Sequence, residues 1–109
     1  MQGLQVALEK TRKALNYYIG EMEKKGKDKA ESERLYRVEK AKMILKYRME
    51  KMAVTLISDL VRGDPYVADL KMRKETAATS YDVTLQRIYQ CKTEIEIIKY
   101  NMSAVRKGE

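Results

Sequence analysis

The side chains that most often carry catalysis and metal binding are nearly missing from this sequence. It contains no histidine, a single cysteine (Cys91), and five glycines scattered at positions 3, 20, 26, 63 and 108. Without histidine the commonest general base and metal ligand is lacking, and one cysteine can form neither a zinc cluster nor an intrachain disulfide. Scattered glycines leave no phosphate-binding loop. The sequence therefore predicts a protein that is not an enzyme and uses no metal or cofactor.

One arrangement of side chains does indicate a binding function, and it is a basic stripe on the second of three expected helices. Residues 34–51 include seven basic and two acidic side chains, and the whole chain carries a net charge of +7. At roughly 100° per residue, several of these side chains share one helix face. The predicted nucleic-acid-binding residues on that face are Arg37, Lys40, Tyr47, Arg48, Lys51 and Arg62.

A basic stripe with an interleaved tyrosine can hold phosphates by charge and stack a base on the ring. It has no code for reading base edges, so binding should be largely indifferent to sequence. We expect a nucleic-acid partner, single-stranded DNA in the first instance. The alternative interpretation is a solvated face of lysine and arginine with no ligand.

The elements that would position this stripe follow from the spacing of apolar residues. Alternate steps of three and four residues from Val67 to Val105 meet mostly apolar side chains, and Cys91 is one of them. A repeat this long is typical of one helix that lays a narrow seam against other helices, as in a coiled coil. Cys91 is therefore expected to be a core residue rather than a reactive thiol.

Two further helices are expected upstream, separated near Gly26. Gly26 can end the first helix in the left-handed conformation, and Asp28 with Glu31 forms a capping box for the second. The first helix has a seam of Leu4, Leu8, Thr11, Leu15, Tyr18 and Met22. The second has an inner stripe of Leu35, Val38, Ala41, Leu45, Met49, Met52, Leu56 and Leu60.

The turn Gly63-Asp64-Pro65 predicts a close connection between the second and third helices. Gly63 fits a helix C-cap, Asp64 an N-cap and Pro65 the first helical position. The fold class is therefore all-α: a three-helix antiparallel, coiled-coil-like bundle in one domain, 1–109. Its helices cover about 2–25, 29–62 and 65–107, the second and third forming a long hairpin that the shorter first helix covers in part.

The hairpin tip is apolar on more than one side, and the short first helix cannot reach it. Val54, Ile57 and Val61 lie on a different face from the inner stripe. Because a helix that is apolar all round is normally buried, we expect a homo-oligomer, first of all a dimer, or a partner protein to cover these residues.

Residues 40–70, KAKMILKYRMEKMAVTLISDLVRGDPYVADL, resemble small all-helical proteins of uncertain role that are encoded by phages and prophages of Gram-positive bacteria. The resemblance implies a non-catalytic accessory protein in replication or recombination, or one directed at a host protein. It assigns no functional residue.

Two function classes therefore remain open. The first is a nucleic-acid-binding accessory protein, and the alternative is an inhibitor or adaptor that engages a host or phage protein through the apolar tip. The N-terminus has no long apolar run typical of a signal peptide, and no stretch approaches 18 consecutive apolar residues. We expect a soluble protein of the cytoplasm.

Overall fold

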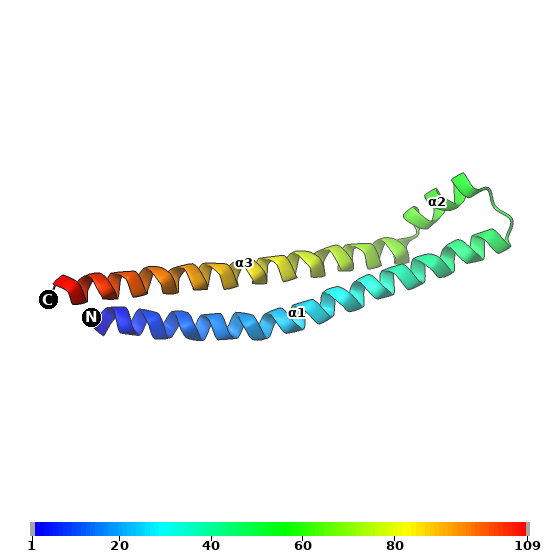
Figure 1. The fold of residues 1–109 in the computed structure, drawn as a ribbon. Helices are drawn as coiled ribbons and strands as arrows, with labels where there is room; N and C mark the ends of the chain where they lie inside the picture. The colour runs from blue at the N-terminus through cyan, green and yellow to red at the C-terminus, as the bar shows by residue number, and fades with distance from the viewer. Residues whose placement is uncertain (1, 109) are drawn as a thin grey trace. The chain divides into compact units, whose positions relative to one another are not determined.

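A computed structural model of the chain describes residues 2–108 and shows helices joined by short connections (Figure 1). The helices are α1 (Gln2–Met49), α2 (Val54–Gly63) and α3 (Pro65–Gly108). Residues 2–108 contain no strand. The predicted all-α fold with three helices is confirmed, but the lengths of its first two helices differ from the prediction.

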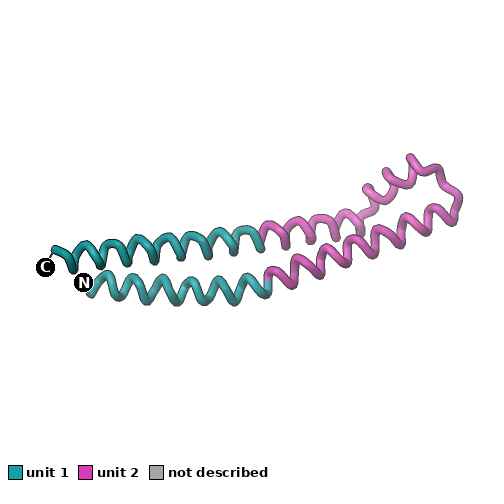
Figure 2. The backbone as a smooth tube through the Cα atoms, viewed as in Figure 1, with its two compact units in different colours: residues 1–24, 81–109 teal, residues 25–80 magenta. Residues whose placement is uncertain are grey.

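The chain divides into two compact units, each of which includes part of α1 and part of α3 (Figure 2). Unit 1 consists of the described residues up to Lys24 together with those from Tyr81 onward, and unit 2 is Lys25–Ser80. The two units share α1 and α3, and the single domain expected for residues 1–109 stays a prediction.

Unit 1 is an antiparallel pair of helices, formed by the first part of α1 and the last part of α3 (Figure 2). From α3, Thr84, Ile88, Cys91 and Ile95 are buried. From α1, the seam predicted from Leu4 to Met22 is partly buried at every position. The α3 seam is confirmed along its whole length except at Val105, which is 39% exposed. Cys91 is a buried free cysteine, as predicted.

Unit 2 packs three helical segments around a small apolar cluster. The cluster consists of Ile57 and Val61 from α2 and Val67 from α3. Partly buried side chains of α1 and of the connection to α2 pack against it: Tyr36, Met43, Ile44, Tyr47 and Met52. The short helix α2 therefore contributes most of the buried side chains at the centre of this unit.

The expected break at Gly26 does not occur, because α1 continues through it. One glycine inside a helix costs only about 1 kcal/mol relative to alanine, and its neighbours are good helix formers. Asp28 is not an N-cap: its carbonyl accepts a hydrogen bond from Ser32 Oγ at 2.7 Å inside the helix. The Arg34 guanidinium hydrogen-bonds to the Glu31 carboxylate one turn away and holds the pKa of Glu31 below its usual value.

The helix instead breaks between Met49 and Val54, so the predicted second helix, about 29–62, is wrong. The N–H of Met52 donates to the carbonyl of Tyr47 at 3.2 Å, and that of Lys51 to the carbonyl of Arg48 at 3.0 Å. These two bonds define a Schellman motif, which satisfies the last carbonyls of a helix. Lys51 occupies its left-handed position with φ of 62°, where glycine is usual.

The turn at Gly63-Asp64-Pro65 is present, but it joins the short α2 to α3. Asp64 caps α3 as predicted: the N–H of Val67 donates to its Oδ1 at 3.0 Å, and Pro65 is the first helical residue. Gly63 is the last residue of α2 and does not take the left-handed conformation, and the C-cap that follows it is Asp64 in an extended conformation (φ −67°, ψ 126°). The expected long hairpin of two long helices around this turn is therefore wrong.

The inner stripe predicted for the second helix is also largely wrong. Val38, Leu45 and Met49 are 37%, 59% and 76% exposed. The side of α1 that faces inward in unit 2 instead continues the 4-3 spacing of Leu4 to Met22 as far as Met43 and then steps four residues to Tyr47. Every member is partly buried: Lys25, Lys29, Ser32, Tyr36, Glu39, Met43 and Tyr47. Because α1 is unbroken at Gly26, its register is not reset, and the inward face includes polar residues.

Candidate nucleic-acid interface

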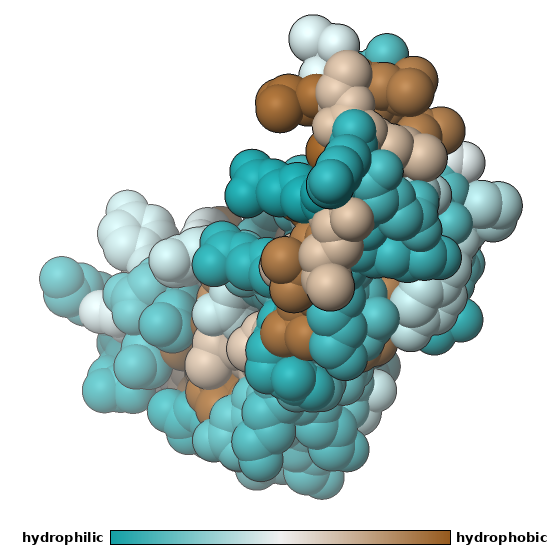
Figure 3. All heavy atoms as spheres, turned by 90° about the vertical axis from the view of Figure 1, so that its right-hand side faces the viewer, coloured by the Kyte–Doolittle hydropathy of each residue, from teal (hydrophilic) through white to brown (hydrophobic). Residues whose placement is uncertain are grey.

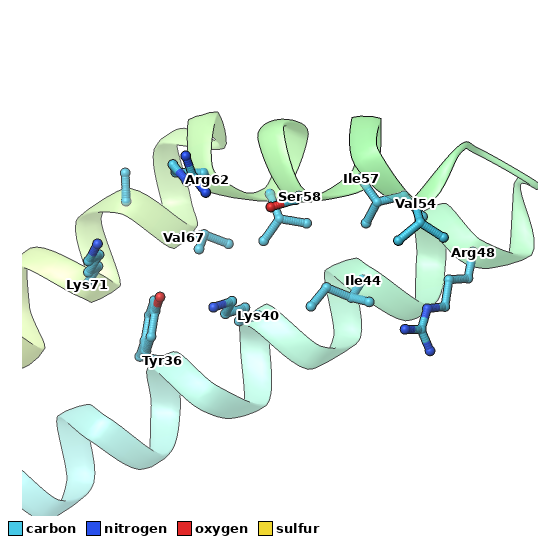
Figure 4. A pocket seen from close by; sticks show the side chains of 12 residues that line it. Tyr36, Lys40, Ile44, Arg48, Val54, Ile57, Ser58, Arg62, Val67 and Lys71 are labelled. Carbon is cyan, nitrogen blue, oxygen red and sulfur yellow. The ribbon is translucent and has the colours of Figure 1, made fainter.

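A cavity of about 450 Å³ lies inside unit 2, where α1, α2 and the start of α3 meet (Figure 4). In the close-up, Tyr36, Lys40 and Ile44 extend from α1 toward α2, while Ile57 and Val67 face them from the other side. We call this cavity the basic cleft. Its lining residues are Tyr36, Lys40, Ile44, Arg48, Val54, Ile57, Ser58, Val61, Arg62, Val67, Ala68 and Lys71.

The floor of the basic cleft is apolar and well packed. Ile57, Val61 and Val67 are 5%, 2% and 3% exposed, and they form the central cluster of the unit. Two of these residues, Ile57 and Val61, belong to the ten-residue helix α2. The Schellman motif before α2 and the Asp64 cap after it fix both ends of this helix. The floor is therefore part of the folded core rather than a loose surface.

Four basic side chains from three helices surround this floor: Lys40 and Arg48 from α1, Arg62 from α2 and Lys71 from α3. All four are exposed, and no carboxylate lines the cleft. Across residues 2–108, none of the four forms an ion pair with a carboxylate. Their positive charges are not neutralised by the fold, so the cleft is suited to an anion.

Tyr36 is the aromatic member of the cleft, and two ammonium groups lie near its ring. Lys40 Nζ is 5.5 Å from the ring centroid, and Lys74 Nζ, from α3, is 4.9 Å from it. Both distances are within the range of cation–π attraction. These contacts connect α1 with α3 beside the cleft and place the ring at its wall (Figure 4).

The structure brings together three of the six predicted nucleic-acid-binding residues, Lys40, Arg48 and Arg62. Arg37 does not line the cleft, and its guanidinium is paired with Glu33 at 2.8 Å. Lys51 also lies outside the cleft lining, in the Schellman motif.

Tyr47 does not line the cleft. Its ring is partly buried against the central cluster of unit 2, as is the ring of Tyr36, and its expected role in stacking on a base stays a prediction. Two other residues of the cleft lining, Tyr36 and Lys71, were not among those predicted from the sequence. The signal for Tyr36 was the 4-3 spacing that continues through Gly26, because it places residue 36 on the inward face.

The predicted interface of Val54, Ile57 and Val61 is wrong for two of its members. Ile57 and Val61 are buried inside unit 2, because α2 is a separate helix that turns this face toward α1. Val54 is 75% exposed and also borders the cleft.

Other apolar side chains remain exposed in unit 2. On α2 they are Leu56 and Leu60, and Figure 3 shows apolar atoms gathered at the top of the face, where α2 lies. On α1 they form a row that we call the outer stripe: Val38, Ala41, Leu45 and Met49. A groove beside the outer stripe is lined by Lys42, Leu45, Lys46, Met49 and Glu50. These surfaces, and not Ile57 and Val61, are the apolar faces left uncovered.

In residues 2–108 no group of acidic, cysteine or histidine side chains could hold a metal ion, and none of the helices is long and apolar enough to cross a membrane. Comparison with protein-family models, curated proteins and solved structures finds no significant match. The resemblance to phage-encoded helical proteins therefore stays a prediction.

Proposed function

We propose that this protein binds nucleic acid without catalysis, and that the basic cleft of unit 2 is the contact surface. The observation that carries the proposal is that Lys40, Arg48, Arg62 and Lys71 all line one cavity and that none of them is paired with a carboxylate within residues 2–108. Positive charges without an internal partner attract phosphates and release counterions when they bind them. A phage-type accessory role in replication or recombination, in the cytoplasm, is part of the same proposal.

Reversing the charge of the cleft tests this proposal directly. The variant Lys40→Glu/Arg62→Glu/Lys71→Glu should bind a single-stranded oligonucleotide far more weakly than the unmodified chain in fluorescence anisotropy at 50 mM salt. The salt dependence of the unmodified protein should be steep, with a log–log slope of roughly −0.7 for each phosphate contact.

A matched control separates the cleft from the overall charge of +7. Lys10, Lys13 and Lys99 are exposed residues of unit 1, and their reversal to Glu changes the net charge by the same amount. This control should keep most of the affinity. Equal loss in both variants would show that only net charge matters, and undiminished binding by the cleft variant would refute the proposal.

A second candidate function, binding of a protein partner, is favoured by the uncovered apolar surface. None of the 48 residues of α1 is buried, and the outer stripe presents Leu45 and Met49 to solvent. We propose that this stripe packs against a second copy of the chain, since symmetric self-association is the commonest way to cover such a face. A host or phage protein as occupant is the other outcome of the same test, which is given at the end of the Discussion.

A further inference from the structure

We propose that the basic cleft takes one unstacked nucleobase, so that the protein prefers single strands to duplexes. This inference rests on the proposed function: the four basic side chains hold phosphates, and the cavity between them receives a base. In this arrangement the aromatic contact comes from Tyr36, because it is the tyrosine that lines the cavity.

The size of the cavity agrees with such a ligand. Its volume of about 450 Å³ lies within the range of small-molecule sites, roughly 300–1,000 Å³. A groove that bound only the phosphate backbone would need charge but no apolar depression. Here the depression exists, and its floor is made of Ile57, Val61 and Val67, which are all buried.

The chemistry of the lining agrees as well. A base has an apolar face and a polar edge, and the cleft provides both an aliphatic floor and two hydroxyl-bearing side chains, Tyr36 and Ser58 (Figure 4). The Tyr36 ring can contact a base face, which is a sequence-tolerant interaction because every base has one. The basic side chains lie around this space, where the phosphates that flank an inserted base would pass.

Strand preference follows from this geometry. In a duplex the bases are paired and stacked, so inserting one into the cleft requires unpairing and unstacking that amount to a few kcal/mol. A single strand offers unpaired bases and gains both the phosphate and the base contacts. A duplex can use only the phosphate contacts.

The test fills the cavity without changing its charge. Ala68 lines the cleft, is exposed and lies on α3, so Ala68→Phe places a bulky ring where the base would lie. The variant should bind a dT12 oligonucleotide about 5- to 150-fold more weakly, the loss expected from one stacking contact. Its binding to a 12-base-pair duplex should change less than twofold. Ala104→Phe, an exposed alanine of α3 in unit 1, is the matched control and should leave both affinities unchanged.

A second measurement changes the ligand and leaves the protein as it is. A 12-mer of abasic sites keeps the phosphates and has no bases, so the unmodified protein should bind it with the affinity that Ala68→Phe shows for dT12. Equal binding of dT12 and the abasic oligomer would overturn this inference while leaving the proposed function intact. No binding of dT12, duplex or abasic oligomer at 50 mM salt would overturn the proposed function as well. The abasic comparison decides the matter even if Ala68→Phe does not fold.

Discussion

Tyr47 and Tyr36 both pack against the cluster of Ile57, Val61 and Val67. Only Tyr36 also lines the basic cleft, and Lys40 and Lys74 lie near its ring. Whether a tyrosine of α1 lines the cleft thus depends on the helix face that it occupies. That face is set by the register of α1, which continues unbroken through Gly26.

Tyr47→Ala should therefore act on stability. Removing a partly buried aromatic ring from the central cluster of unit 2 should lower the free energy of unfolding by roughly 2 kcal/mol or more. Urea denaturation followed by circular dichroism measures this change. Under conditions where the variant remains folded, its affinity for an oligonucleotide should equal that of the unmodified chain. Unchanged stability with weakened binding would return Tyr47 to the nucleic-acid interface.

Gly63→Ala should stabilise the protein by about 0.5–1 kcal/mol. Gly63 is the last residue of α2, has no positive φ, and leaves open space where a Cβ would be added. Alanine fits this conformation and reduces the conformational freedom of the unfolded chain. Had Gly63 been the left-handed C-cap indicated by the sequence, the same substitution would strain the turn. A fall in the urea midpoint would therefore indicate that Gly63 takes the left-handed conformation.

At the scale of the element, the end of α1 shows how a helix stops without glycine or proline. The Schellman motif places Lys51 at a left-handed position, and Met52, the next residue, packs beside Tyr47 against the central cluster. Burial of Met52 offsets the cost of a non-glycine residue at this φ. Because the stop depends on tertiary packing, the local sequence contains no conventional signal for it.

Lys51→Gly should raise the free energy of unfolding by about 1 kcal/mol, since glycine takes the left-handed conformation without steric conflict. Lys51→Ala is the control: it removes the same charge, keeps the Cβ, and should leave stability nearly unchanged. The difference between the two urea midpoints isolates the backbone effect. If glycine stabilises no more than alanine does, the left-handed assignment of Lys51 is wrong.

Gly26 and Lys51 together explain why the helix boundaries were harder to predict than the helices themselves. Sequence signals indicated a stop at Gly26, where the cost of continuing is about 1 kcal/mol, and none at Lys51. The α3 seam was predictable almost residue by residue, because its spacing of three and four residues continues from Val67 to Met102 and departs from the apolar pattern only at Lys74 and Thr84. The Asp64 cap was predictable for the same reason: its signal is local.

The candidate site was predictable only in part, and register is the cause. Lys40, Arg48 and Arg62 were selected as members of one helix face, but they meet because α2 folds back over α1. Their shared cavity, and the addition of Lys71 from α3, depend on a turn at Lys51 that the sequence does not indicate. Charge composition led to the proposed kind of ligand, whereas the shape of the candidate site required the structure.

At the scale of the whole molecule, the balance between buried and exposed apolar residues is the main physical feature. In residues 2–108 the buried apolar side chains are Ile57, Val61, Val67, Leu70, Ile88, Cys91 and Ile95. All of them lie on α2 or α3, and α1 has none. The inward side chains of α1 are only partly buried, so a further packing partner would stabilise this helix by covering more of its apolar surface.

Leu45→Glu should dissociate the self-associated form that we propose. Leu45 belongs to the outer stripe and is 59% exposed, so a charge there is harmless in a single chain but would be buried unpaired between two copies. Met72→Glu is the control, because Met72 is an apolar residue of α3 with a similar exposure of 60% that lies outside the stripe. Sedimentation equilibrium at high micromolar concentration should show a dimer for the unmodified chain and for Met72→Glu, and a monomer for Leu45→Glu. A monomeric unmodified chain would rule out self-association. The outer stripe would then be the docking face for a different protein, and Leu45→Glu should abolish the capture of that protein.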